Sequence, residues 1–186
     1  MEALAHLAPP VRSLEAPLTP KARRLRFSRS CYDHLAGRLG VAVAAELEAR
    51  GYLTAPDPAS KQYSVTIAGR HWFYELGIEV ATLKPTAAGV ARRCLDWTER
   101  RHHLAGPLGT ALMARFAELA WIRRDRASRA VSITPTGSSE LRRLLQIETL
   151  DLMDAPSGLF LQGRCEKALD SGDVSAVDET RTAWSS

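Results

Sequence analysis

Two cysteines and two histidines recur in the same order along the chain and could ligate a metal ion. His34 lies three residues after Cys31, and His103 lies nine residues after Cys94. Thiolate and imidazole groups together bind soft or borderline divalent ions such as Zn²⁺, Cd²⁺ or Pb²⁺. Such a site requires the donor atoms to lie within roughly 4 Å of one another, even in the metal-free protein.

A structural role explains the same residues more simply. An unpaired cysteine often behaves as a small buried hydrophobic residue, and duplicated residues usually preserve a duplicated fold. We therefore favour no metal and no other cofactor. A soft or borderline divalent metal at Cys31, His34, Cys94 and His103 is kept as the alternative. The odd total of three cysteines, with no Cys-x-x-Cys pair, argues against a disulfide framework.

Four arginines fall within seven residues and could contact phosphate groups. They lie in a stretch whose pattern predicts a β-hairpin, and wings of this kind often touch the DNA backbone or the minor groove. The alternative is a solvated basic hairpin tip. The residues concerned are Arg123, Arg124, Arg126 and Arg129.

The charge is distributed unevenly. The whole chain carries +4, whereas residues 147–186 carry a net −5, so residues 1–146 are near +9. A basic body with an acidic tail suggests contact with a polyanion such as nucleic acid. No apolar run approaches the roughly 18–20 residues of a membrane span, and no signal peptide is recognisable. We expect a cytoplasmic protein without a membrane partner.

The enzyme motifs with a known mechanism are missing from the sequence. It contains no phosphate-binding loop, no Gly-x-Ser-x-Gly, no dinucleotide-binding fingerprint and no His-Glu-x-x-His. Aromatic residues such as Trp72, Trp97 and Trp121 could line a small-molecule pocket, but core packing explains them more simply. We therefore expect that the protein is not an enzyme.

These residues are positioned by an internal repeat. The seven residues His34–Gly40 recur as His103–Gly109, with one difference, 69 residues later. Arg29–Asp33 matches Arg92–Asp96, and the second copy then carries a six-residue insertion, Trp97–His102. The shared glycines predict close backbone contacts or sharp turns between helices.

Each copy has the pattern of a winged helix. An apolar-periodic helix over residues 41–50 or 110–120 is followed by two short strands, which the alternation predicts to form a hairpin. A last helix follows over 71–76 or 138–147, introduced by a threonine cap and, in the second copy, by Pro135. With a preceding helix, the order is helix, helix, hairpin, helix. The predicted class is mainly α with small β-hairpins (α+β), as a tandem repeat of two winged-helix-like units.

The repeat divides the chain into four regions. Residues 1–28 are a proline-rich linker with the remnant of a preceding helix, and residues 29–84 are the first winged-helix-like repeat. Residues 85–147 are the second repeat. Residues 148–186 are an acidic tail, which its composition predicts to be partly disordered.

The repeated segments resemble a known regulator family. Ser30–Gly40, Cys94–Arg101 and His103–Gly106 are similar to the C-terminal half of ArsR-type (arsenic-repressor-like) helix-turn-helix transcriptional regulators. The resemblance covers about residues 1–145 and implies a transcription factor that is usually a homodimer. In that family a DNA-binding domain precedes the two repeats. Here Met1–Ala5 looks like only the tail of that domain's last helix, so the resemblance implies DNA as the partner of a domain missing here.

The expected function is that of an ArsR-type transcriptional regulator, or of its sensor and dimerisation region. The helix over 110–120 offers only Thr110, Arg115 and Glu118 as polar side chains, which is a poor set for reading base edges. We therefore expect at most weak, non-specific DNA contact by this chain alone. One alternative is a metal- or small-molecule-binding sensor module without DNA contact. Another is a protein-interaction fragment that pairs with a full-length regulator.

Overall fold

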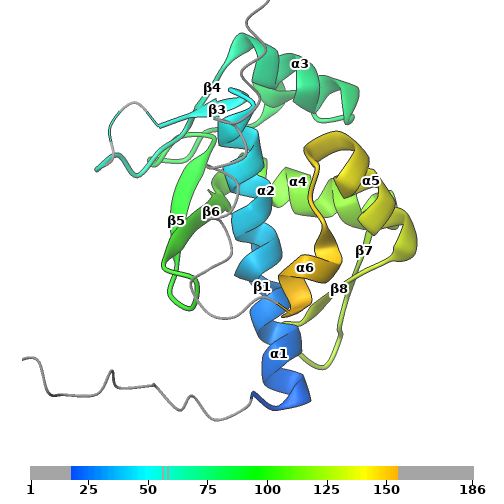
Figure 1. Cartoon of the computed structure of the whole chain (residues 1–186). Helices are drawn as coiled ribbons and strands as arrows, with labels where there is room; N and C mark the ends of the chain where they lie inside the picture. Colours follow the sequence, from blue (N-terminus) through cyan, green and yellow to red (C-terminus); the bar gives the residue numbers. More distant parts are fainter. Residues whose placement is uncertain (1–17, 56, 58, 155–186) are drawn as a thin grey trace, which may run out of the picture. The chain divides into compact units, whose positions relative to one another are not determined.

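The computed structural model describes residues 18–154, apart from residues 56 and 58, and its elements run twice through the same order (Figure 1). Helix α1 (Pro20–Phe27) comes first. The first copy contains β1 (Arg29–Cys31), β2 (His34–Ala36), α2 (Gly37–Ala49), β3 (Leu53–Thr54), β4 (Ser64–Val65) and α3 (Ile67–Glu75). After the 3-10 turn η1 (Val80–Thr82), the second copy contains β5 (Arg92–Asp96), β6 (Arg101–Ala105), α4 (Gly106–Glu118), β7 (Ile122–Arg124), β8 (Val131–Ile133) and α5 (Pro135–Leu145). Helix α6 (Thr149–Asp154) follows.

The α+β class with small β-hairpins is confirmed, but the order of elements within each copy differs from the prediction. All the sheets among the described residues are two-stranded and antiparallel. Each copy begins with a hairpin, β1–β2 or β5–β6, where a helix was predicted. The observed order is hairpin, helix, hairpin, helix, so the prediction of a helix at the start of each winged-helix-like unit is wrong.

In the first hairpin, β1 alternates between half-buried and buried residues, whereas all three residues of β2 are buried. Ser30 and Leu35 are buried cross-strand partners, while Tyr32 is 90% exposed at the turn. Tyr32 adopts φ 58°, in the left-handed region, which lets two residues reverse the chain. A period of two within three-residue strands is too short a signal to be distinguished from a helical period.

The insertion in the second copy lengthens its hairpin. Cys94 pairs with His103 as Cys31 pairs with His34. Beyond Cys94 the strands continue with two further pairs, Leu95 with His102 and Asp96 with Arg101, before the turn. The repeat is therefore preserved on both sides of the extra residues, and the longer turn is free to reach other parts of the fold.

The two copies exchange their hairpins. We call β3–β4 and β7–β8 the first and second wings. The second wing pairs with β1 of the first copy, because Ser30 N–H donates to the Arg129 carbonyl at 2.8 Å and Val131 N–H donates to the Ser28 carbonyl at 3.1 Å. The first wing pairs with the second hairpin in the same way: Arg93 N–H donates to the Lys61 carbonyl at 2.9 Å.

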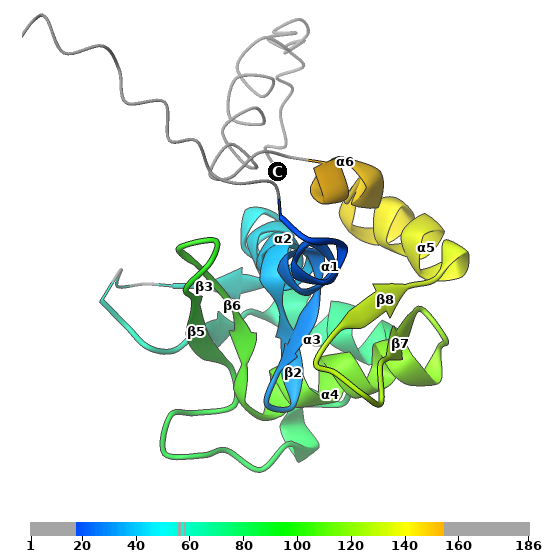
Figure 2. The same ribbon diagram turned by 90° about the horizontal axis from the view of Figure 1, so that it is seen from below.

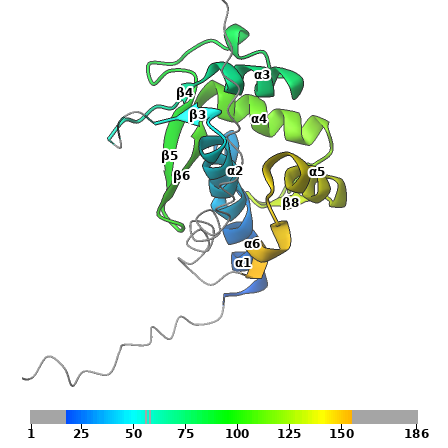
Figure 3. The same cartoon turned by 45° about the horizontal axis from the view of Figure 1, so that its top comes forward.

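The helices follow the same reciprocal rule. Strand β2 packs against α4 and β6 packs against α2, so each hairpin lies on the central helix of the other copy. Helix α5 contacts α2, and α3 lies beside α4 (Figure 3). The carbonyl of Leu76, at the end of α3, accepts a hydrogen bond of 2.7 Å from Arg115 Nε on α4. Neither copy therefore has a complete core of its own.

Glycines permit this close packing, as the sequence predicted. A Cβ atom on Gly40 would lie 2.5 Å from the Leu35 carbonyl oxygen, and one on Gly109 would lie 2.5 Å from the equivalent oxygen of Leu104. These glycines lie in the first turns of α2 and α4, not between two helices as expected. Both helices thus begin at Gly37 and Gly106, four residues earlier than predicted.

The core contains equivalent residues from the two copies. Leu39 and Leu108 are fully buried, as are Leu47 and its counterpart Phe116. The predicted helix caps are present: the Thr66 hydroxyl accepts from Gly69 N–H, and Thr134 does the same for α5, which begins at Pro135. Each cap satisfies a backbone donor at the helix start.

The remaining predictions about the chain's ends lie largely outside the described residues. These include the helix remnant at residues 1–5 and the acidic tail from residue 155 onward. The described residues other than Asp154 belong to one compact unit. Within the described part of the chain, no helix combines the length and the apolar character that crossing a membrane requires.

Replacing Gly37 with alanine tests the close packing at the start of α2. Gly37 and Gly51 have similar φ angles of +78° and +69°, but a Cβ on Gly37 would lie 2.8 Å from the Arg26 carbonyl oxygen, whereas one on Gly51 would meet nothing within 4 Å. Gly51→Ala should cost about 1 kcal/mol of unfolding free energy for the left-handed backbone alone. Gly37→Ala should cost about 1–3 kcal/mol more, measured by chemical denaturation. Equal losses in the two variants would contradict the predicted clash.

Candidate metal centre and basic surface

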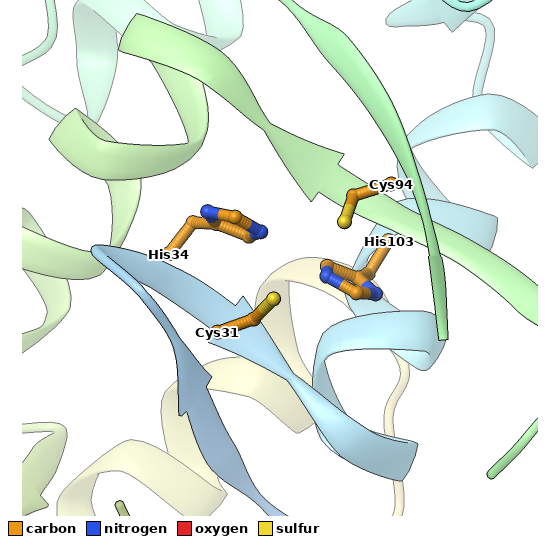
Figure 4. Close-up of side chains that lie close together, drawn as sticks. All are labelled: Cys31, His34, Cys94 and His103. Carbon is orange, nitrogen blue, oxygen red and sulfur yellow. The ribbon is translucent and has the colours of Figure 1, made fainter. Parts of the chain in front are cut away.

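The fold brings together the two cysteines and two histidines singled out by the sequence. Cys31 and His34 are cross-strand partners on the first hairpin, and Cys94 and His103 are cross-strand partners on the second. Partners of this kind present their side chains on the same face of a sheet. Figure 4 shows the two pairs pointing toward each other between the hairpins. One ligand atom from each residue lies within 4.8 Å of all the others.

The distances are slightly longer than the roughly 4 Å expected of a preformed site. The rings of His34 and His103 stack with their centroids 5.1 Å apart and their planes inclined by 29°. Both histidines are only 1% exposed, whereas the two cysteines are partly accessible. The cluster therefore has an inner imidazole pair and two thiols nearer to solvent.

The environment keeps both imidazoles neutral. Burial lowers the pKa of His34, although the neighbouring Asp33 carboxylate acts against this effect. Burial, together with the adjacent His34, lowers the pKa of His103 to about 4. Neutral imidazole is the form that carries a lone pair for a metal ion.

The thiol of Cys94 is held in its protonated form. Burial raises its pKa, and the adjacent Cys31 adds to this effect. A metal ion would have to displace this proton, because thiolate is the form that ligates metals.

Each imidazole has a carboxylate beside its Nδ1 atom. Asp33 Oδ1 lies 3.1 Å from His34 Nδ1, and Asp96 Oδ2 lies 3.8 Å from His103 Nδ1. Asp33 and Asp96 each stand two residues after a cysteine of the cluster. The Asp33 carboxylate can orient the His34 ring and fix which nitrogen carries the proton, whereas Asp96 lies beyond hydrogen-bonding distance of His103.

Asp96 also joins the two copies. Its side chain is fully buried, accepts from Arg29 Nη2 at 2.6 and 2.8 Å, and accepts from Gly37 N–H at 2.8 Å. Burial by itself would raise its pKa, but hydrogen bonds from Thr98 and Gly37 and the charge of Arg29 hold the pKa at about 2. The carboxylate therefore stays ionised beside the cluster at all ordinary pH values.

The inserted turn supplies a second link of the same kind. Glu99 Oε1 lies 3.1 Å from Arg26 Nε of α1, and Glu99 Oε2 lies 3.6 Å from Arg38 Nε of α2. Arg38 Nη1 in turn donates to the Leu152 carbonyl of α6 at 2.9 Å. The extra residues of the second copy thus fasten α1, α2 and α6 around the cluster.

A groove of about 630 Å³ gives access to the cluster from the side of α1. Cys31 and His103 line it, together with Arg29 and the indole of Trp97, which is 81% exposed. Small solutes can therefore approach the partly accessible thiol of Cys31 without unfolding of the hairpins, whereas the His103 imidazole forms the buried floor of the groove.

The four predicted arginines lie together on the second wing, where Arg129 also lines the groove beside Cys31. Arg123, Arg124, Arg126 and Arg129 are all exposed, and within residues 18–154, residues 56 and 58 aside, no salt bridge involves them. Asp125 shapes the tip instead, since its carboxylate accepts from Ala127 N–H at 2.8 Å and from the Ser128 hydroxyl at 2.6 Å. The hairpin therefore presents its guanidinium groups to solvent.

Helix α1 adds basic residues that the sequence reasoning did not assign to a site. Lys21, Arg23 and Arg24 are exposed, and α1 packs against β8 of the second wing (Figure 2). The charge of Arg24 acts on Asp125 at the wing tip. The run of basic residues before residue 29 can be seen in the sequence. Its position beside the second wing could not be predicted, because it depends on how the two copies pack together.

One curated relative supports a relationship to transcription regulators. The chain is 38% identical over 148 residues to a protein of Bacillus subtilis (strain 168) named "Uncharacterized HTH-type transcriptional regulator YdfF". The match covers 80% of this chain and 64% of that protein, so the chain spans somewhat less than two thirds of the relative's length. No protein-family model matches the chain, and no solved structure matches it significantly.

Removing the Asp96 carboxylate should destabilise the joined copies strongly. Asp96→Ala leaves the half-buried Arg29 without its partner and the Gly37 N–H unsatisfied, a loss of about 3–5 kcal/mol in unfolding free energy. Glu140→Ala breaks the exposed pair with Arg143 on α5 and should change stability little. Urea denaturation of both variants measures the contrast. A fully stable Asp96→Ala protein would contradict the role given to this carboxylate.

Proposed function

We propose that this chain is the sensor and dimerisation region of an ArsR-type helix-turn-helix transcriptional regulator. The observation that carries the proposal is the 38% identity over 148 residues to a protein named as a transcriptional regulator. The ArsR type is carried by the repeated His-Leu-Ala-Gly segments. The relative's name also favours a non-enzymatic role.

In this proposal, the reading of an operator belongs to a helix-turn-helix domain outside the residues of this chain, and the regulator acts as a homodimer. Helix α2 is unsuited to base reading because nine of its thirteen residues are buried. Helix α4 exposes Ala114, Ala117 and Glu118, and its Arg115 is tied to Leu76 and Glu118. The guanidinium groups of these helices, Arg38 and Arg115, are therefore buried or already bonded, and neither helix has an amide side chain to contact base edges.

The second wing and α1 instead supply a basic surface suited to phosphate groups. Four arginines of the wing and three bases of α1 are exposed on adjoining elements. Contacts of this type position a protein on DNA but carry no sequence information. The chain would thereby support a DNA-bound regulator without choosing its site.

The test is fluorescence anisotropy on two unrelated DNA duplexes at two salt concentrations. Affinity should be micromolar or weaker and nearly equal for both duplexes, and four phosphate contacts would give a log–log salt slope of at most about −3 to −4. Reversing Arg124 and Arg126 to glutamate should weaken binding to both duplexes alike. Tight, sequence-selective binding would show that a base-reading helix lies in this chain.

Reversing Arg142 and Arg143 on α5 provides the matched control. It changes the net charge by the same amount but lies on another exposed element. Binding should be weakened much less than by the wing variant, apart from the general effect of charge. Equal weakening would assign the binding to net charge alone and remove the wing from the proposal.

A further inference from the structure

We propose that Cys31, His34, Cys94 and His103 form a four-coordinate site for a zinc-class divalent ion, bound between the two hairpins. The donors are two thiols and two imidazoles that all lie within 4.8 Å of one another. Two sulfur and two nitrogen donors in a tetrahedral arrangement are characteristic of structural zinc sites. Hard ions such as Mg²⁺ and Ca²⁺ prefer oxygen ligands and do not suit this set.

Unpartnered ring nitrogens at the centre of the cluster provide an independent observation. His34 Nε2 and both nitrogens of His103 are buried without a hydrogen-bond partner among the described residues. Buried polar atoms in folded proteins are almost always satisfied, and one that is not destabilises the fold. An ion ligated by one nitrogen of each ring would give two of these three buried nitrogens a partner.

The surrounding carboxylates are placed as they are around bound metals. Asp33 lies within hydrogen-bonding distance of His34 Nδ1, which leaves His34 Nε2 to ligate. Asp96 stands 3.8 Å from His103 Nδ1, which is longer than a hydrogen bond, so this second pair would have to shorten when the ion binds. A carboxylate on the far nitrogen of each histidine is the usual outer shell of a zinc site.

The size of the cluster requires only a modest contraction. With Zn–S near 2.3 Å and Zn–N near 2.0–2.1 Å, donors at the corners of a tetrahedron lie about 3.3–3.8 Å apart. Cys31 and His34 come from the strand pair next to the turn of the first hairpin, and Cys94 and His103 from the middle pair of the second hairpin. Rotation of the cysteine side chains, which are partly accessible, can supply most of the contraction. The groove lined by Cys31 and His103 gives the ion a path to the site.

Four protein ligands leave no open coordination position, so the ion would have a structural or regulatory role, not a catalytic one. It would link β1–β2 of the first copy to β5–β6 of the second. A role for this ion as the effector of the regulator rests on the proposed function. Binding of the ion to the four residues does not depend on that function. Loss of DNA contact and loss of metal binding are therefore separate experimental outcomes.

The experiment is a Co²⁺ titration of the full chain after reduction and chelator treatment, under anaerobic conditions. One equivalent should produce a thiolate-to-metal charge-transfer band and the intense visible bands of tetrahedral cobalt. One equivalent of Zn²⁺ should then abolish both. With zinc at about a hundredfold excess over its Kd, the melting temperature should rise by roughly 5–10 °C.

Matched variants locate the site. Cys31→Ser, Cys94→Ser and His103→Gln should each lose the one-to-one tetrahedral signal. Cys165→Ser and His102→Gln, which alter the third cysteine and the neighbouring imidazole, should keep it. Circular dichroism of the metal-free variants checks that each remains folded.

Two results would overturn the proposal. The first is failure of the fully reduced, folded wild-type chain to bind either Co²⁺ or Zn²⁺ stoichiometrically. A disulfide between Cys31 and Cys94, formed in a separate oxidised sample, would not rescue the proposal in that case. The second is a tetrahedral thiolate signal that persists when Cys31 and Cys94 are both replaced by serine. Wild-type binding lost in that double variant supports the site whatever the individual variants do.

Discussion

The exchange of hairpins between the two copies is the constraint on which the rest of the structure depends. Each short hairpin lies on the central helix of the other copy and pairs at its edge with the other copy's wing. Two-stranded hairpins of this length are not stable on their own in water. The copies therefore fold as one body, and whatever lies where they meet is held by both of them.

The junction between the two copies contains the four candidate ligands, which are Cys31, His34, Cys94 and His103. The glycines of α2 and α4 let the opposite hairpin approach, so that a Cβ on Gly40 would lie 3.6 Å from His103 Cβ and one on Gly109 would lie 3.3 Å from His34 Cβ. The same approach brings the two Cys–His pairs face to face. Asp96 of β5 and Glu99 of the inserted turn then form ion pairs that bind the second copy to β1, α1 and α2. A site at this junction therefore takes its ligand atoms from both copies.

The repeat, its helix caps and its glycine contacts could be predicted from the sequence because they depend on local chemistry. The recurrence of His34–Gly40, the threonine caps and the close contacts at the glycines all follow from residue type and spacing. The first hairpin was missed because three-residue strands give too little periodicity. The neighbours of each copy could not be predicted at all, because a hairpin can pack on its own central helix or on the other copy's with the same local sequence. The sequence therefore shows that the cysteines and histidines occupy equivalent positions in the two copies. It does not show that the four side chains lie close together in the fold.

X-ray absorption at the zinc edge, on the reduced chain loaded with one equivalent of Zn²⁺, tests most directly whether the junction of the copies is a metal centre. A zinc ion bound as we propose should have a first shell of two sulfurs near 2.3 Å and two imidazole nitrogens at about 2.0–2.1 Å. A shell made only of nitrogen and oxygen atoms would contradict it. So would a protein that retains no zinc after gel filtration.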